Sequence, residues 1–176
     1  MGREAGRNNK GEKEMHSTHE TKIKNTETPS CEVTEKRVRE VVVNYRGRRR
    51  DSFLIDSPVV SAHHIRGLLP DNSREHFVAL YLDSANKVIG FAVVATGTAT
   101  TCLAHPREVF QRAVLLGAVS LVIGHNHPSG SPSPSTEDDK VTRVMKEGGG
   151  ILGIKLLDHV IVTATQHYSF SEAGAL

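Results

Sequence analysis

Two histidines separated by one residue, His125 and His127, are the part of this 176-residue sequence that most strongly indicates chemistry. They follow the apolar run VSLVIG (119–124), which is typical of a buried strand. Residues i and i+2 of an extended chain point to the same side, and Pro128 favours an extended backbone at His127. The two imidazoles are therefore expected to converge just beyond a strand end, where they are suitable ligands for a divalent first-row metal.

A third ligand is expected from beyond the loop PSGSPSP (128–134), whose prolines and glycine can turn the chain back. Ser135-x-x-Asp138 matches a capping box, which predicts the start of a helix and needs no function of its own. Asp138 and Asp139 both fall in its first turn, about 100° apart around the helix axis, and the local sequence does not choose between them. Two histidines and one carboxylate leave a fourth zinc position for a water, whose pKa the metal lowers.

Other metal sites fit this pattern less well. A metallo-β-lactamase site requires His-x-His-x-Asp-His, but Ser129 and Gly130 stand at its last two positions. The zincin helix His-Glu-x-x-His is absent from the sequence. Two histidines and a carboxylate also form the iron site of non-haem oxygenases, and that alternative stays open.

The elements around the motif alternate between strands and helices, which predicts an α/β (α+β) sandwich built around one sheet. Helices are expected where a cap residue or a proline precedes apolar residues at helical spacing, over residues 57–69, 105–117 and 136–147. The glycines at 148–150 are expected to end the last of these helices. Strands are expected over the apolar runs 41–45, 77–82, 88–95, 98–103, 119–124, 154–162 and 168–170.

The N-terminal part differs in composition from the rest of the chain. Residues 1–35 are polar and poor in aromatic and branched apolar side chains, so we expect a disordered tail followed by a folded domain over 36–176. Lys and Arg outnumber Glu in residues 1–50, whereas acidic residues outnumber basic ones in residues 51–176. The basic segment Lys36–Arg50 could contact DNA, although a solvated tail explains the same charge.

The sequence favours a cytoplasmic protein without a membrane segment. The N-terminus has no apolar stretch of the kind that forms a secretory signal. No run approaches the roughly 18 apolar residues that a membrane-spanning helix needs. The two cysteines, Cys31 and Cys102, lie far apart without metal-type spacing, which argues against a disulfide framework and fits a reducing compartment.

The spacing His125-x-His127-x7-Ser135-x-x-Asp138 resembles the JAMM motif of the JAB/MPN metallo-isopeptidases. The sequence around this motif is even more similar to the bacterial RadC-like proteins. The matching segments are EHFVALYLD (75–83), HPREVFQRA (105–113), HNHPSG (125–130), PSPSTEDD (132–139) and GIKLLDHVIV (153–162). The resemblance covers about residues 57–171 and implies a JAB1/MPN-like, cytidine-deaminase-like mixed β-sheet sandwiched by helices. The helix-hairpin-helix region typical of full-length RadC proteins has no clear counterpart in residues 1–50, so the chain resembles the short, stand-alone variety.

The resemblance also implies a role for each site residue. His125, His127 and Asp138 would hold Zn²⁺, which settles the choice between the two aspartates. Glu75 matches an upstream glutamate and would act as the general base, taking a proton from water and passing it to the leaving amine. Ser135 would donate a hydrogen bond to the oxyanion of the tetrahedral intermediate.

These inferences lead to a zinc-dependent hydrolase that cleaves an amide or isopeptide bond in a protein or peptide substrate that the sequence does not identify. The alternative is a DNA repair or recombination accessory that binds DNA through Lys36–Arg50 without hydrolase activity. A third interpretation is a binding module whose metal is structural. Asp158 and His159, which belong to the resemblance, are expected to support the metal ligands from behind. The sequence predicts no oligomeric state.

Overall fold

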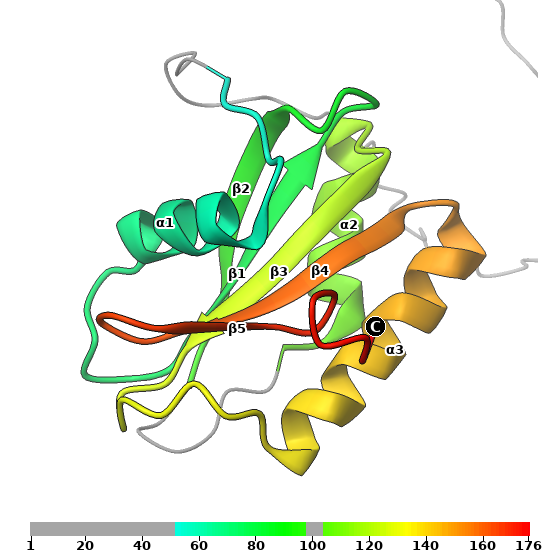
Figure 1. Ribbon diagram of the computed structural model, residues 1–176. Helices are drawn as coiled ribbons and strands as arrows, with labels where there is room; N and C mark the ends of the chain where they lie inside the picture. The colour runs from blue at the N-terminus through cyan, green and yellow to red at the C-terminus, as the bar shows by residue number, and fades with distance from the viewer. Residues whose placement is uncertain (1–51, 98–103) are drawn as a thin grey trace, which may run out of the picture. The chain divides into compact units, whose positions relative to one another are not determined.

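The computed structural model describes residues 52–97 and 104–176. The elements in chain order are α1 (Pro58–Leu68), β1 (His76–Leu82), β2 (Val88–Thr96), α2 (Pro106–Leu116), β3 (Ser120–Asn126), α3 (Thr136–Leu152), β4 (Lys155–Val162) and β5 (His167–Ser169) (Figure 1). Each helix and strand predicted within this range is present. The strands predicted over 41–45 and 98–103, the tail 1–35 and the basic segment 36–50 lie outside the described residues.

The strands form one five-stranded sheet in the order β2-β1-β3-β4-β5. Strand β1 is antiparallel to both β2 and β3, β3 is parallel to β4, and β5 is antiparallel to β4. A parallel pair needs a crossover connection, which α3 supplies between β3 and β4. The sheet is therefore mixed, as predicted. None of the helices in the described part of the chain is long and apolar enough to cross a bilayer.

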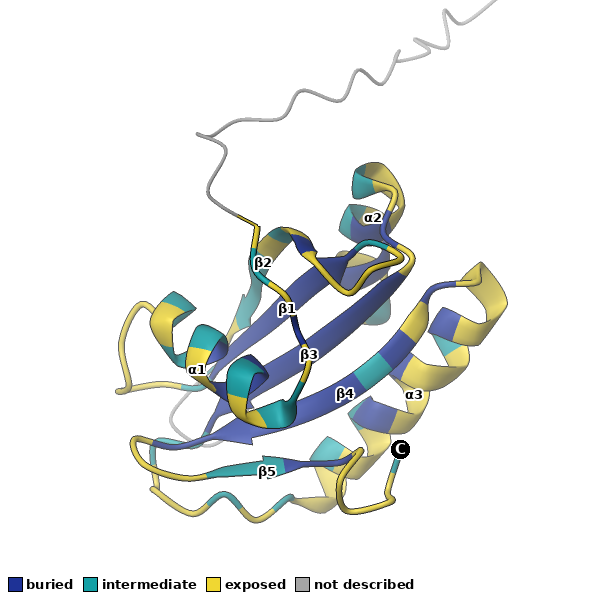
Figure 2. Ribbon diagram, turned by 45° about the horizontal axis from the view of Figure 1, so that its top comes forward, coloured by how far each residue is buried: buried dark blue, intermediate teal, exposed yellow. Residues whose placement is uncertain are grey.

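Helices cover both faces of the sheet, which explains why β1 and β3 are buried along their whole length (Figure 2). On one face, α1 contributes Ala62 and Ile65 to an apolar cluster with the sheet residues Val78, Leu80 and Val122. On the other face, α2 and α3 contribute a second cluster that includes Val109, Phe110 and Met145. Each large apolar side chain buried in this way contributes about 1.5–3 kcal/mol, and the sandwich fixes β3 between the two layers.

Cap residues predicted from the sequence mark the starts of the first two helices and the end of the second. Ser57 precedes α1 and its hydroxyl accepts a hydrogen bond from the Val60 amide at 3.4 Å. His105 precedes α2 and its Nδ1 accepts from the Arg107 amide at 3.1 Å. Gly117 ends α2 in the left-handed conformation at φ 67°, as expected for a glycine at a helix C-terminus.

Helix α3 is longer than the sequence predicts. The glycines at 148–150 do not end it, and it continues to Leu152 before Gly153 stops it at φ 68°. A Cβ atom on Gly149 would lie 2.3 Å from the Ile154 carbonyl oxygen, and one on Gly148 would lie 3.0 Å from the Phe110 ring. The first two glycines therefore serve close packing. The prediction was wrong because sequence spacing does not reveal these contacts.

Candidate metal centre

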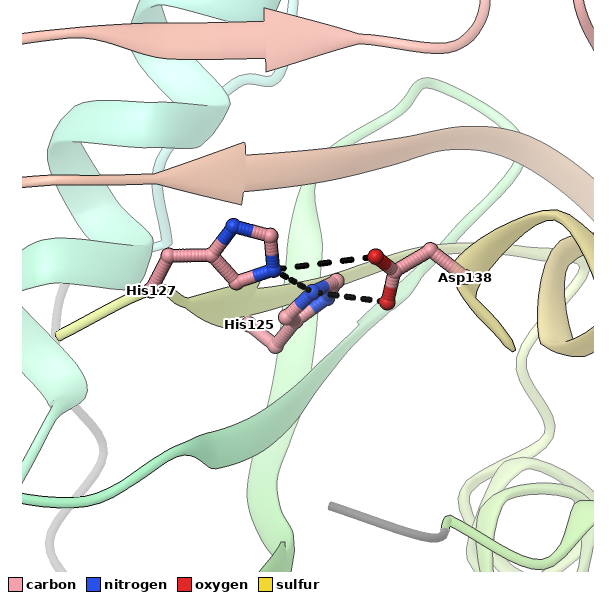
Figure 3. A group of neighbouring side chains, drawn as sticks. All are labelled: His125, His127 and Asp138. Carbon is pink, nitrogen blue, oxygen red and sulfur yellow. Dashed lines mark hydrogen bonds and ion pairs between the residues drawn. The ribbon is translucent and has the colours of Figure 1, made fainter. Parts of the chain in front are cut away.

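Three side chains predicted as metal ligands point toward one another at the end of β3 and the start of α3 (Figure 3). The Nε2 atoms of His125 and His127 lie 3.0 Å apart. Asp138 Oδ1 lies 3.0 Å from His125 Nε2, and Asp138 Oδ2 lies 3.6 Å from His127 Nε2. Tetrahedral zinc with metal–nitrogen bonds of about 2.0–2.1 Å separates its ligand atoms by about 3.3 Å. The three groups are thus spaced as ligands of one small cation.

His127 is held by the loop that follows it. The His127 carbonyl accepts a hydrogen bond from the Gly130 amide at 3.1 Å, which closes a turn with Pro128 at its second position. This turn brings the Ser131 carbonyl within 2.8 Å of His127 Nδ1. A carbonyl can only accept, so Nδ1 carries the proton and the lone pair of Nε2 faces His125 and Asp138.

His125 is held from the interior of the protein. Its Nδ1 lies 2.9 Å from Nε2 of His159, whose Nδ1 lies 2.5 Å from the hydroxyl of Thr142. That hydroxyl donates to the Asp138 carbonyl oxygen at 2.6 Å. His159 therefore lies behind the centre and contacts a predicted ligand.

A bulge in β4 places His159 on the correct face of the sheet. Leu156 packs in the cluster beneath α2 and α3, and three residues later His159 would face the opposite layer if the strand were regular. The register with β3 shifts between Leu121↔Leu156 and Val122↔Asp158, so one extra residue enters β4. Asp158 accepts instead from the Ser169 hydroxyl at 2.7 Å. Of the pair expected to support the ligands, only His159 contacts one.

Asp138 is fixed by the predicted capping box. Its Oδ2 accepts from both the amide and the hydroxyl of Ser135, each at 2.7 Å, while the Asp138 amide donates back to the Ser135 hydroxyl at 3.2 Å. Oδ1 is left to face His125. Asp139 is exposed and is not part of the cluster, so the helix geometry selects Asp138.

The three side chains of the cluster shift one another's pKa values. Burial raises the pKa of Asp138, but the neighbouring imidazoles of His125 and His127, which bond to its carboxylate when they are protonated, outweigh burial and hold the pKa far below its usual range. Pairing with Asp138 raises the pKa of His127, burial opposes this rise, and the Ser131 carbonyl and the charges of Asp138 and Glu75 add to it. Complete burial lowers the pKa of His159 well below its usual value, which leaves its ring neutral.

Glu75 lies at the edge of this centre. It immediately precedes β1 and is half-buried. Phe77 pairs with His125 in the antiparallel register of β1 and β3, so continuing that register by two residues places Glu75 opposite His127. Its negative charge contributes to the raised pKa of His127. The Glu75 carboxylate is therefore close enough to interact electrostatically with the cluster.

Asn126, between the two histidines, is a site residue that the sequence interpretation missed. It is completely buried. Its Oδ1 accepts from the His76 amide at 2.8 Å, and its Nδ2 donates to Asn72 Oδ1 at 2.9 Å and to the Arg74 carbonyl at 2.8 Å. These bonds clamp both sides of Glu75. The sequence pattern that could have revealed Asn126 is the alternation of side chains along a strand: if His125 and His127 point to one face of the sheet, Asn126 points to the other.

The fold is a mixed sheet between helical layers. Two histidines lie at the end of a central strand and an aspartate lies at the start of the crossover helix. Together these features define a JAB/MPN-type domain whose cluster could bind a metal. Residues 55–175 match the family model of the RadC-like JAB domain, and the chain belongs to that family.

Curated relatives agree with this assignment. The chain is 42% identical over 113 residues to a UPF0758 protein of Chlorobium chlorochromatii, covering 64% of this chain and 51% of the relative. It is 45% identical over 123 residues to a UPF0758 protein of Rubrobacter xylanophilus, covering 70% and 54%. A third, from Bacillus licheniformis, is 42% identical over 127 residues, covering 72% and 57%. The chain therefore spans about half the length of the curated relatives it matches, and their names state no activity.

Proposed function

We propose that this domain is a zinc-dependent hydrolase that cleaves an amide bond in a protein or peptide. The observation that carries the proposal is the convergence of two imidazole Nε2 atoms and Asp138 Oδ1, with separations of 3.0 Å between His125 and each of the other two. Hydrogen bonds at Nδ1 leave the lone pair of His127 free on that side. Lone pairs and a carboxylate oxygen repel one another at such distances, and a cation between them turns this repulsion into coordination.

The ligand set leaves one side of the centre accessible. The His125 side chain is 4% exposed, whereas those of His127 and Asp138 are 13% and 15% exposed. Zinc bound there would lower the pKa of a water and polarise the substrate carbonyl. Substrate would approach past His127 and Asp138, since His125 forms the inner wall.

Glu75 is proposed to move the proton in this reaction. Its carboxylate takes a proton from the attacking water as the new carbon–oxygen bond forms. It then delivers that proton to the amide nitrogen as the carbon–nitrogen bond breaks, so the products are a carboxylate and an amine. The clamp by Asn126 keeps the segment that carries Glu75 beside the ligands.

Ser135 is proposed to stabilise the oxyanion, as the family motif implies. Its hydroxyl donates to Asp138 Oδ2 at 2.7 Å. Ser135 is an exposed residue, and its hydroxyl can turn toward a substrate, since the Ser135 amide also donates to Asp138 Oδ2 at 2.7 Å and keeps that oxygen satisfied.

Metal content measured by mass spectrometry tests the first step. Wild-type protein purified without chelators and supplied with zinc is expected to hold about one zinc ion per chain. Asp138→Ala should lose it, whereas Asp139→Ala, which removes the neighbouring exposed carboxylate, should keep it. A wild-type protein that takes up iron in preference to zinc would favour an oxygenase, and one that binds neither would refute the metal centre.

Turnover tests the second step. Zinc-loaded protein is incubated with a peptide and isopeptide library, and products are identified by mass spectrometry. Glu75→Gln should retain zinc and lose product formation, because glutamine keeps the shape but cannot accept the proton. Equal product formation by Glu75→Gln and wild type would remove Glu75 as the base.

The uneven charge of the sequence supports a second candidate function, DNA binding through Lys36–Arg50. Phosphate contacts by Arg46, Arg48, Arg49 and Arg50 would give an affinity that falls steeply with salt. Replacing these arginines by alanine should abolish binding to duplex DNA and leave zinc content unchanged. Lack of binding by the full chain at low salt would refute this function.

A further inference from the structure

Thr142 and His159 connect the two elements that carry the predicted ligands. Thr142 lies one turn beyond Asp138 in α3, and His159 lies in β4, which pairs with the strand of His125. The His159 ring is completely buried and stacks on Phe170 at 4.8 Å between ring centres. It makes hydrogen bonds at both nitrogens, with His125 on one side and Thr142 on the other.

The positions of the protons follow from what each group can donate. The Thr142 hydroxyl has one proton and gives it to the Asp138 carbonyl, which can only accept. Thr142 must then accept from His159 Nδ1, so that nitrogen carries a proton. The His159 ring is completely buried, and its two hydrogen-bond partners are an imidazole and a hydroxyl, neither of which offsets a positive charge. The ring therefore carries one proton, so its Nε2 accepts from His125 Nδ1, and the lone pair of His125 is left on Nε2.

We propose that Thr142 and His159 are positioning residues that hold His125 in its Nδ1–H tautomer, with Nε2 ready to bind the metal. This inference rests on the proposed metal site. The chain of hydrogen bonds runs from the Asp138 backbone to the His125 ring, so it also sets the ring's orientation relative to the Asp138 carboxylate.

The competing proton arrangement explains why the hydroxyl matters. Without it, His159 can protonate at Nε2 and donate to His125 Nδ1. The His125 proton then sits on Nε2, where it makes a hydrogen bond with Asp138 Oδ1 across the 3.0 Å separation of those atoms. That arrangement satisfies the metal-free cluster and blocks the lone pair that a metal needs. Loss of such supporting partners typically costs about 10–100-fold in metal affinity.

The test compares Thr142→Val with Thr142→Ser, which keeps the hydroxyl. In metal-free protein, long-range proton–nitrogen NMR of the imidazoles reports which His125 nitrogen carries the proton, without any metal or substrate. In zinc-loaded protein, competition with a chelator gives the zinc Kd. We expect Nδ1–H at His125 in wild type and Thr142→Ser, and Nε2–H in Thr142→Val together with about 10–100-fold weaker zinc binding.

His159→Phe is the second variant, because phenylalanine preserves the stack on Phe170 and removes both hydrogen bonds. It should also weaken zinc binding by about 10–100-fold, and it carries the test if Thr142→Val does not fold. Zinc affinities within threefold of wild type in folded Thr142→Val and His159→Phe, or an Nε2–H tautomer in wild type, would overturn the inference. Failure of wild type to bind zinc would instead refute the proposed function, while the NMR result still decides the tautomer.

Discussion

Replacing Asn126 by alanine should destabilise the protein and separate metal binding from catalysis. The side chain makes three hydrogen bonds of 2.8–2.9 Å inside the protein, to the His76 amide, Asn72 and the Arg74 carbonyl. A typical intramolecular hydrogen bond contributes about 1 kcal/mol net, and a buried donor left without a partner costs about 1–3 kcal/mol. We therefore expect a loss of about 3–4 kcal/mol from a total unfolding free energy of about 5–15 kcal/mol.

Urea unfolding measures this loss, and hydrogen exchange at the His76 amide shows where it arises. Since β3 remains paired with β1 and β4, zinc stoichiometry should stay at about one. Glu75, between the two clamped positions, loses its fixed placement, so cleavage should fall by more than zinc binding does.

Asn72→Ala is the matched control, because Asn72 is exposed and its loss removes only one of the three bonds. It should cost about 1 kcal/mol or less. The reasoning would be refuted if Asn126→Ala cost no more than this control and the His76 amide stayed protected from exchange.

Three further predictions concern packing, the core and pH. Gly149→Ala should lose about 2–3 kcal/mol in urea unfolding, because its Cβ would meet the Ile154 carbonyl at 2.3 Å. Gly150→Ala, whose Cβ has nothing within 4 Å, should instead gain about 0.5–1 kcal/mol from helix propensity; equal effects would contradict the packing explanation. Tyr81→Phe should lose about 0.5–1.5 kcal/mol, read as a lower Tm, since it removes a 3.2 Å hydrogen bond to the Val109 carbonyl. Zinc affinity, measured by chelator competition, should fall about tenfold per pH unit as the pH drops below the raised pKa of His127, because zinc must displace the proton on Nε2. Above that pKa the affinity should level off. An affinity independent of pH on the acid side would exclude His127 as a ligand.

Local rules predict the parts of this fold whose cause lies in neighbouring residues. Ser57 and His105 cap their helices, and Ser135 begins α3, because each side chain bonds to an amide two or three residues away. The passage of α3 through Gly148 and Gly149 depends instead on close contacts with Phe110, which belongs to α2, and with the turn at Ile154. A glycine that ends a helix and a glycine that allows close packing look alike in the sequence, so only the contacts in the folded protein distinguish them.

The candidate site divides in the same way. The period of two along β3 predicts that His125 and His127 share a face, and it equally requires Asn126 to point into the opposite, α1-covered face. A buried amide must find hydrogen-bond partners there, so a clamp at that position follows from the pattern. The pattern does not predict which groups Asn126 binds. The register between β1 and β3 decides that these groups lie on either side of Glu75. The tautomer of His125 depends in turn on Thr142 and on a bulge in β4. The candidate ligands are thus readable from a short stretch of sequence, whereas their orientation depends on the assembled sheet.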